Sequence, residues 1–201
     1  MDETRIVTVS AGLRQPSSTR LLADRLGAAA VAALEAEGAK ASVETVELRD
    51  IAHDVVNMML TGFPAGGLPE VLEKVTGAAG LIAVTPVFTT SYSGLFKSFV
   101  DILDNRALTG VPVLLGATGG TPRHSLALEY NLRPLFTYLH ADVVTTSVFA
   151  ATDDWADDGA LLRRIDQAAG ELAKKVAAAQ PRKPADEFNS VPSFEQLLRR
   201  G

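Results

Sequence analysis

The sequence predicts a three-layer α/β sandwich, in which a parallel sheet of five strands carries helices on both faces. Short apolar runs alternate with longer amphipathic segments about five times along the chain, which is typical of parallel strands joined by helices. With 201 residues, 47% of them hydrophobic, the chain can bury one substantial core. No repeat or linker divides residues 1–180, so we expect one domain there.

The predicted strands are short runs rich in aliphatic and β-branched residues, which suit a buried pleated sheet. Pro86 follows the third run. Because proline has no N–H to donate, we expect the third strand to stop there. In chain order, the strands are predicted at residues 5–9, 42–48, 80–85, 111–117 and 143–149.

The segments between the strands carry apolar residues three and four positions apart, as helices do. Gly38 should end the first helix, and Ser93 should cap the helix after the third strand. Pro134 should kink the helix before the fifth strand. The helices are predicted at residues 19–37, 51–60, 68–76, 93–103 and 125–140, and a last one carries apolar positions from 161 to 176.

The composition changes after Gln180. Residues 181–201 contain three prolines, followed by Phe194 and the pair Leu197–Leu198. We expect a C-terminal tail that docks these side chains on its own domain or on a partner subunit.

Charge and composition exclude several kinds of protein. The net charge of −5 argues against binding to nucleic acid. The chain contains no cysteine, which removes disulfides, thiolate catalysis and cysteine metal sites. It shows neither a signal-peptide pattern nor an apolar stretch long enough for a membrane. We therefore expect a cytoplasmic protein.

Three of the strands, the first, third and fourth, end in loops of unusual composition. In a sheet ordered 2-1-3-4-5 these strands are neighbours, and ligands bind beyond their carboxyl ends, at the switch point between the first and the third. We expect the loops, at residues 10–19, 85–93 and 117–125, to meet at one site.

The first loop has the composition of an anion site. It places hydroxyls and backbone N–H groups at a helix N-terminus, and Arg14 adds a charged fork. It lacks a P-loop lysine and the dinucleotide glycine spacing, so it suits a monophosphate. A capped helix start with an incidental arginine is the alternative.

The other two loops suit a flat ligand that forms hydrogen bonds. The second presents rings and hydroxyls from Phe88 to Tyr92, although a helix cap with packed aromatics would also explain it. In the third, Gly119 and Gly120 allow close backbone approach. A plain turn would explain these glycines but not the adjacent Arg123 and His124.

Taken together, the loops resemble those of the NADPH-dependent FMN reductases of the flavodoxin-like superfamily, especially the branch partnered with luciferase-like flavin monooxygenases. The resemblance covers residues 4–180 and implies a flavodoxin-like sandwich that uses FMN and NADPH. The matching segments are Gly12-Leu13-Arg14-x-x-Ser17-x-Thr19, then Thr85-Pro86-x-Phe88-x-x-Ser91-x-Ser93-Gly94-x-x-Lys97-x-x-x-Asp101, then Thr118-Gly119-Gly120.

The resemblance also implies roles for the three loops. The first would hold the FMN phosphate, the second would lie against the isoalloxazine ring and ribityl chain, and the third would close over the ring's other edge. Arg123 and His124 are candidates for the phosphates of the nicotinamide nucleotide. The implied flavin-binding residues are Ser10, Gly12, Leu13, Arg14, Ser17, Ser18, Thr19, Pro86, Val87, Phe88, Thr89, Thr90, Ser91, Thr118, Gly119 and Gly120.

Hydride transfer from a nicotinamide to a flavin requires no protein nucleophile or acid, because the cofactors carry the chemistry. The chain accordingly lacks the G-x-S-x-G and H-E-x-x-H motifs, and we expect neither a catalytic side chain nor a metal. The acidic run at 153–158 is more typical of a helix start than of a metal site.

The predicted activity is therefore an NAD(P)H-dependent FMN reductase that supplies reduced flavin to a partner monooxygenase. Two alternatives stay open: a flavin-retaining reductase of quinones, azo compounds or chromate, and a flavodoxin-like electron carrier. The wide apolar arc of the helix at 93–103 leaves one side for another subunit, and the resemblance implies a homodimer or tetramer.

Overall fold

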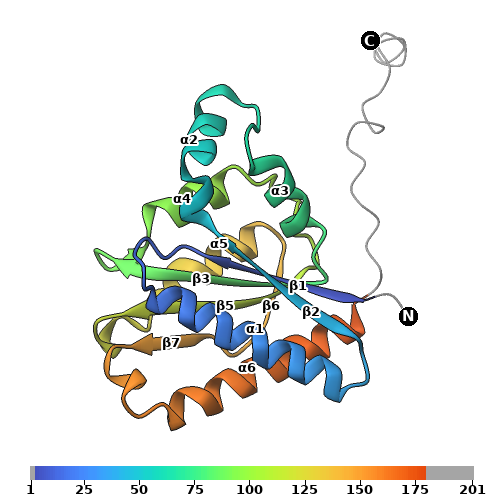
Figure 1. Ribbon diagram of the computed structural model, residues 1–201, viewed down its shortest axis with the longest axis vertical. Helices are drawn as coiled ribbons and strands as arrows, with labels where there is room; N and C mark the ends of the chain where they lie inside the picture. The colour runs from blue at the N-terminus through green and yellow to red at the C-terminus, as the bar shows by residue number, and fades with distance from the viewer. Residues whose placement is uncertain (1–2, 180–201) are drawn as a thin grey trace.

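The computed structural model describes residues 3–179, which form a central parallel sheet between two layers of helices (Figure 1). Neighbouring strands follow the order β2-β1-β3-β5, and β6 and β7 both pair with β5. The strands are β1 (Thr4–Ser10), β2 (Ala41–Glu47), β3 (Gly80–Phe88), β4 (Ser91–Tyr92), β5 (Pro112–Gly119), β6 (Asp142–Val143) and β7 (Val148–Ala151).

This order confirms the predicted flavodoxin-like sandwich of order 2-1-3-4-5. The described residues form seven strands instead of five for two reasons. The fifth strand is divided into β6 and β7, and a two-residue strand, β4, runs antiparallel to the end of β3.

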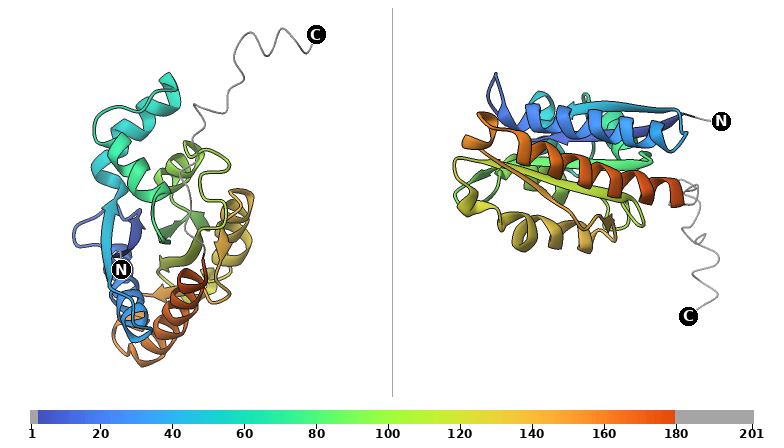
Figure 2. Two further views of the ribbon diagram at one scale, coloured as in Figure 1. Left: turned by 90° about the vertical axis from the view of Figure 1, so that its right-hand side faces the viewer. Right: turned by 90° about the horizontal axis from the view of Figure 1, so that it is seen from below.

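The helices divide between the two faces of the sheet. Figure 2 shows α1 and α6 side by side on one face, where their apolar residues form one core with the sheet. The other four helices build the second core on the opposite face. The helices are α1 (Ser18–Ala36), α2 (Ala52–Thr61), α3 (Leu68–Thr76), α4 (Gly94–Asp101), α5 (Arg133–Tyr138) and α6 (Gly159–Ala178).

The structure confirms the helix cap predicted at Ser93 and the helix end predicted at Gly38. The Ser93 hydroxyl accepts the Phe96 N–H at the start of α4, and Gly38, with a φ of +84°, follows the end of α1. Among the described residues, no helix combines the length and the apolarity that crossing a membrane requires. The predicted tail, residues 181–201, lies outside the described residues.

The prediction that Pro86 ends the third strand is wrong. β3 runs two residues past it, and Pro86 pairs in register with Thr118 of β5. The Val84 carbonyl accepts the Ala11 N–H on the β1 side. Pro86, two residues later, faces that same side, where β1 has already ended. Its missing N–H therefore costs no ladder hydrogen bond.

A tight hairpin replaces the polar loop predicted after β3. The chain turns through Thr89 and Thr90 into β4, and Phe88 pairs with Ser91 across the turn. Thr89 and Thr90 have φ values of +46° and +72°, the pattern of a type I′ turn. Left-handed backbone is unfavourable for β-branched residues, so this turn is strained next to the carboxyl end of β3.

The predicted kink at Pro134 appears as a change of helix type. Residues Leu128–Leu132 form a π-helical turn, in which the Arg133 N–H donates to the Leu128 carbonyl five residues earlier. Pro134 then occupies the second position of α5, where the missing N–H is not needed. The single helix predicted for 125–140 is therefore two segments.

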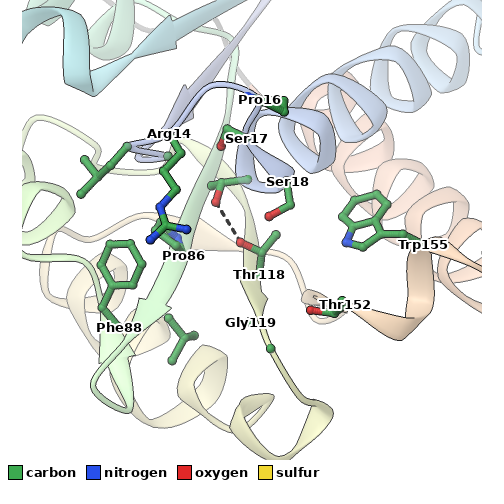
Figure 3. Close-up of a pocket in the computed structure, with 15 residues that line it drawn as sticks. Arg14, Pro16, Ser17, Ser18, Pro86, Phe88, Thr118, Gly119, Thr152 and Trp155 are labelled. Atoms are coloured by element: carbon green, nitrogen blue, oxygen red, sulfur yellow. Dashed lines mark hydrogen bonds between the residues drawn. The ribbon is translucent and has the colours of Figure 1, made fainter.

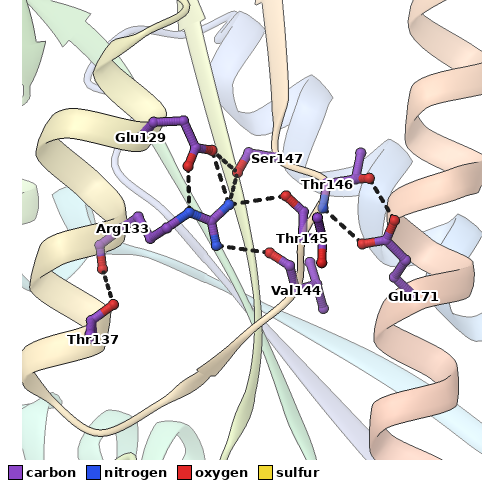
Figure 4. Close-up of polar contacts among 8 residues, drawn as sticks. All are labelled: Glu129, Arg133, Thr137, Val144, Thr145, Thr146, Ser147 and Glu171. Carbon is purple, nitrogen blue, oxygen red and sulfur yellow. Dashed lines mark hydrogen bonds and ion pairs between the residues drawn. The ribbon is translucent and has the colours of Figure 1, made fainter.

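The fifth strand is broken because its centre bulges from the sheet. Val143 pairs with Val113 and Val148 with Gly116, so three steps along β5 correspond to five on its neighbour. Arg133 holds the bulge from one side, donating to the Val144 carbonyl at 2.9 Å (Figure 4). The continuous strand predicted for 143–149 is therefore wrong in its middle.

Glu171 of α6 holds the same bulge from the other side. Its carboxylate accepts the Thr146 N–H at 2.8 Å and the Thr146 hydroxyl at 2.6 Å. Burial opposes ionisation of Glu171, but these hydrogen bonds outweigh it and hold the pKa of Glu171 below its ordinary value. The Arg133 hydrogen bond likewise lowers the pKa of Glu129. Both carboxylates therefore stabilise the folded chain when ionised.

We expect Glu171→Gln to lower the melting temperature at pH 7 and to lower it less at pH 3.5. A depressed pKa gives stability above the unfolded pKa of about 4.3. That stability disappears as the pH falls through the folded pKa. Thermal unfolding of both proteins at the two pH values measures this, with exposed Glu35→Gln as the control. An equal loss at both pH values would contradict the expectation.

Candidate functional site

The carboxyl ends of β1, β3 and β5 open into one pocket of about 670 Å³ (Figure 3). This volume lies within the usual range for small-molecule sites. All three predicted loops contribute to it, and so does the chain after β7. The convergence inferred from the strand order is therefore present in the structure.

Most of the predicted flavin-binding residues line this pocket; the exceptions are Ser10, Thr89, Thr90 and Ser91. Ser10 is completely buried at the end of β1. Thr89 and Thr90 form the hairpin turn. The Ser91 hydroxyl accepts a hydrogen bond from the Asn131 amide at 2.7 Å, so it anchors the hairpin to the π-helical turn.

Arg123 and His124 lie outside the pocket lining. They belong to a short 3₁₀ turn, Pro122–His124, which follows β5. The Thr121 side chain caps this turn by accepting the Arg123 N–H. Their assignment to the nicotinamide nucleotide stays a prediction.

The first turn of α1 supplies the anion-binding end of the site. Ser17 caps the helix, its hydroxyl accepting the Arg20 N–H at 3.2 Å. The first N–H groups of a helix have no intrahelical partner and attract negative charge. The first turn of α1 carries no acidic residue that would oppose an anion. This turn therefore suits a phosphate.

Arg14 lies at the mouth of the pocket and is exposed. Figure 3 shows its guanidinium extending toward Pro86 and Phe88 instead of toward the first turn of α1. The Arg14 guanidinium therefore lies near the end of the pocket that Phe88 forms, which we call the aromatic end. Long exposed arginines change rotamer at little cost, so the guanidinium remains able to swing toward a bound anion.

Two buried hydroxyls join the first loop to the third. Thr19 and Thr118 share a hydrogen bond of 2.8 Å, in which either oxygen can donate, and both side chains are almost fully buried. In the second loop, the Thr85 hydroxyl accepts the Ser93 N–H at 3.0 Å. These bonds fix the loop backbones before any ligand arrives.

Glycine is required at positions 12 and 119 by packing within the protein. A Cβ on Gly12 would overlap the Ser17 hydroxyl, and one on Gly119 would lie 2.9 Å from the Phe149 ring. A Cβ on Gly120 would meet nothing within 4 Å. Both Gly119 and Gly120 were expected to allow ligand approach, whereas Gly119 is already needed for contact with β7.

Sequence reasoning missed three residues of the pocket wall: Pro16, Thr152 and Trp155. The last two follow β7, whose carboxyl end lies beside that of β5. Trp155 packs against the α1/α6 core and is half-buried. Thr152 and Trp155 could have been predicted from the strand order, because that order places the loop after the fifth strand next to the site.

The acidic run after β7 contributes hydrogen bonds and an ion pair. Asp154 accepts the Ala151 N–H at 2.7 Å, and Asp158 pairs with Arg25 of α1 at 2.9 Å. Within residues 3–179, no cluster of three or more His, Cys, Asp or Glu side chains could hold a metal ion.

The chemistry available in this pocket is binding and orientation. Arg14 is the one ionisable side chain among its lining residues, and the rest supply hydroxyls, backbone groups, proline and aromatic rings. An aromatic end beside a helix N-terminus fits a flat ring joined to a phosphate. Redox chemistry carried by such a ligand would need no protein acid or base.

Comparison with known proteins agrees with this arrangement. The family model for NADPH-dependent FMN reductases matches residues 4–156. The FMN reductase (NADPH) of Pseudomonas aeruginosa is 36% identical over 151 residues, which are 75% of this chain and 78% of that protein. The NADH-dependent FMN reductase SfnE of Pseudomonas putida is 35% identical over 168 residues, 82% of this chain and 88% of that one.

A solved structure is also closely similar. An oxidoreductase from Corynebacterium diphtheriae shares 44% sequence identity with this chain and superposes with a TM-score of 0.86. The match covers 90% of this chain and all of that one.

We expect Gly12→Ala to destabilise the protein by about 1–3 kcal/mol, because the added methyl displaces the capping Ser17 hydroxyl. Gly120→Ala is the matched control, since its Cβ meets nothing and should change stability by about 0.5 kcal/mol or less. Urea unfolding of both variants measures the difference. Equal stability of the two variants would show that the loop accommodates the methyl group.

Proposed function

The chain belongs to the NADPH-dependent FMN reductase family and is an NAD(P)H-dependent FMN oxidoreductase, and on that premise we propose that the loop pocket binds the flavin and that reduced flavin is passed to a partner flavin-dependent monooxygenase. One observation carries the placement of the flavin. The pocket combines a helix N-terminus free of acidic residues with an aromatic, glycine-bearing end.

The binding roles follow from that geometry. The backbone N–H groups of Ser18 and Thr19 and the Ser17 hydroxyl would hold the phosphate. Phe88 and the Gly119–Gly120 backbone would hold the isoalloxazine ring, and Arg14 would lie at the mouth of the pocket. Bound FMN supplies the hydride-accepting chemistry. The protein contributes orientation, through loops already held by the Thr19–Thr118 bond.

The exposure of the aromatic end supports release of reduced flavin. Phe88 is 45% exposed and Leu13 is 50% exposed. Arg14, which lies beside Phe88 in Figure 3, is also exposed. A ring bound there keeps one face open to NAD(P)H and to solvent. A flavin-retaining quinone reductase would use the same open face, so the fate of the flavin decides between the two.

We also propose a cytoplasmic homo-oligomer, with its interface away from α4. The apolar side of α4 faces the second core, where Phe96, Phe99 and Val100 are buried. Its other large apolar residues, Leu95 and Ile102, are partly buried and pack against the same core. Tyr130 and Tyr138, in the segment around α5, are 75% and 72% exposed and support subunit contact there.

The first experiment adds FMN to purified protein, removes the excess and records the visible spectrum before and after anaerobic NADPH or NADH. We expect the flavin absorption to bleach with a nicotinamide nucleotide and the reduced flavin to separate from the protein on gel filtration. The same anaerobic sample without nucleotide, kept under the same light, is the control for photoreduction.

The outcomes separate the proposals. Reduced flavin that stays with the protein and reacts with a quinone would replace the supply role by the quinone reductase. Bound flavin that no nicotinamide nucleotide reduces would indicate an electron carrier. Sedimentation at micromolar concentration tests the oligomer, and a monomer would overturn that part.

A further inference from the structure

The hairpin of residues 88–91 forms one wall of the aromatic end, and its turn is strained. Its first residue, Phe88, lines the pocket. The next two, Thr89 and Thr90, have left-handed backbone, with φ values of +46° and +72°. Such backbone is unfavourable for β-branched residues and persists where surrounding contacts fix it. Contacts from outside the turn must therefore hold Phe88 in place.

The base of the hairpin is held within its own segment of the chain. The Thr85 hydroxyl accepts the Ser93 N–H at 3.0 Å. The Tyr92 ring packs against the ring of Phe96, with 6.2 Å between the two centroids, and Phe96 is buried in the core. These contacts fix the point at which the hairpin leaves the sheet. They act below the turn, so they do not set the angle of its tip.

A side chain from another element holds the tip of the hairpin. The Asn131 amide donates a hydrogen bond of 2.7 Å to the Ser91 hydroxyl. Among residues 3–179, Asn131 is the one side chain outside the β3–α4 segment that hydrogen-bonds to the hairpin. Ser91 pairs with Phe88 across the turn, and the side chains of such a pair leave the strands on the same face. The bond therefore fixes the face that carries the Phe88 ring.

The same bond connects two loops that line the aromatic end. Asn131 belongs to the segment after β5, which begins with the Gly119–Gly120 turn of the third loop. The Thr19–Thr118 bond joins the first loop to the third in the same way. Asn131 and Ser91 are both half-buried, and neither side chain titrates. The second loop is thus tied to the third by a neutral hydrogen bond.

We propose that Asn131 is a positioning residue for the flavin: through Ser91 it holds the hairpin so that Phe88 and the third loop together fit the isoalloxazine ring. Asn131 lies outside the pocket lining and acts only through the hairpin. Without its amide, the tip of the hairpin tilts and the ring loses part of its contact. The proposal rests on the flavin site proposed above.

The experiment measures FMN dissociation constants by calorimetry for the natural protein, Asn131→Ala, Ser91→Ala and the double variant. We expect each single variant to bind FMN about fivefold more weakly, the usual effect of losing one neutral hydrogen bond. The double variant should bind no more weakly than either single variant, because both changes remove the same bond. Asn131→Asp should restore most of the affinity, since the Ser91 hydroxyl can donate to a carboxylate.

Turnover gives an independent readout. The KM for FMN should rise by the same factor in Asn131→Ala, while kcat and the KM for NADPH should change less than about twofold, because the lost contact concerns flavin binding alone. Asn57→Ala is the matched control. Asn57 is an exposed residue of α2 outside the pocket lining, and its substitution should leave FMN affinity unchanged.

The outcomes are distinguishable. Unchanged FMN affinity in Asn131→Ala would overturn the proposal. A lower kcat with an unchanged KM for FMN would show a merely structural asparagine and overturn it too, as would losses that add in the double variant. Absence of FMN binding to the natural protein would instead refute the flavin site itself. If Asn131→Ala does not fold, Ser91→Ala and Asn131→Asp carry the comparison.

Discussion

Three neighbouring parallel strands, β1, β3 and β5, end at the same edge of the sheet, and the pocket depends on that constraint. Parallel strands require crossover helices, so the chain returns to this edge after each strand with a new loop. The loops are then joined directly, as by the 2.8 Å bond between Thr19 and Thr118, 99 residues apart. The site is therefore as rigid as the sheet that carries it.

The chemistry of the site follows from neutral donors. Hydroxyls and backbone N–H groups bind an anion without adding a titratable group, and Arg14 is the one ionisable residue of the lining. Such a pocket can hold and orient a redox cofactor. This agrees with hydride transfer between two bound cofactors, in which the protein controls geometry.

Two segments of the fold depart from regular strand pairing. The strained Thr89–Thr90 turn extends the second loop, and the bulge between β6 and β7 precedes the loop that carries Trp155. Arg133 and Glu171 hold that bulge from two sides (Figure 4). Departures from regular pairing are common near binding sites because they redirect side chains without disturbing the core.

The alternation of strands and helices and the three loops could be predicted from the sequence, because apolar periodicity, helix caps and loop composition are local properties. Most of the pocket lining was also predicted, and the composition of the first loop predicted an anion site at a helix start. Tertiary structure decided the rest. Pro86 stays within β3 only because β1 ends earlier, and the fifth strand is divided by side chains from two other helices. Ser10 is buried at the end of β1, Gly119 lies against Phe149, and Trp155, which lies beside Arg25, lines the pocket. Each of these depends on residues distant in the chain, whose proximity no local pattern records.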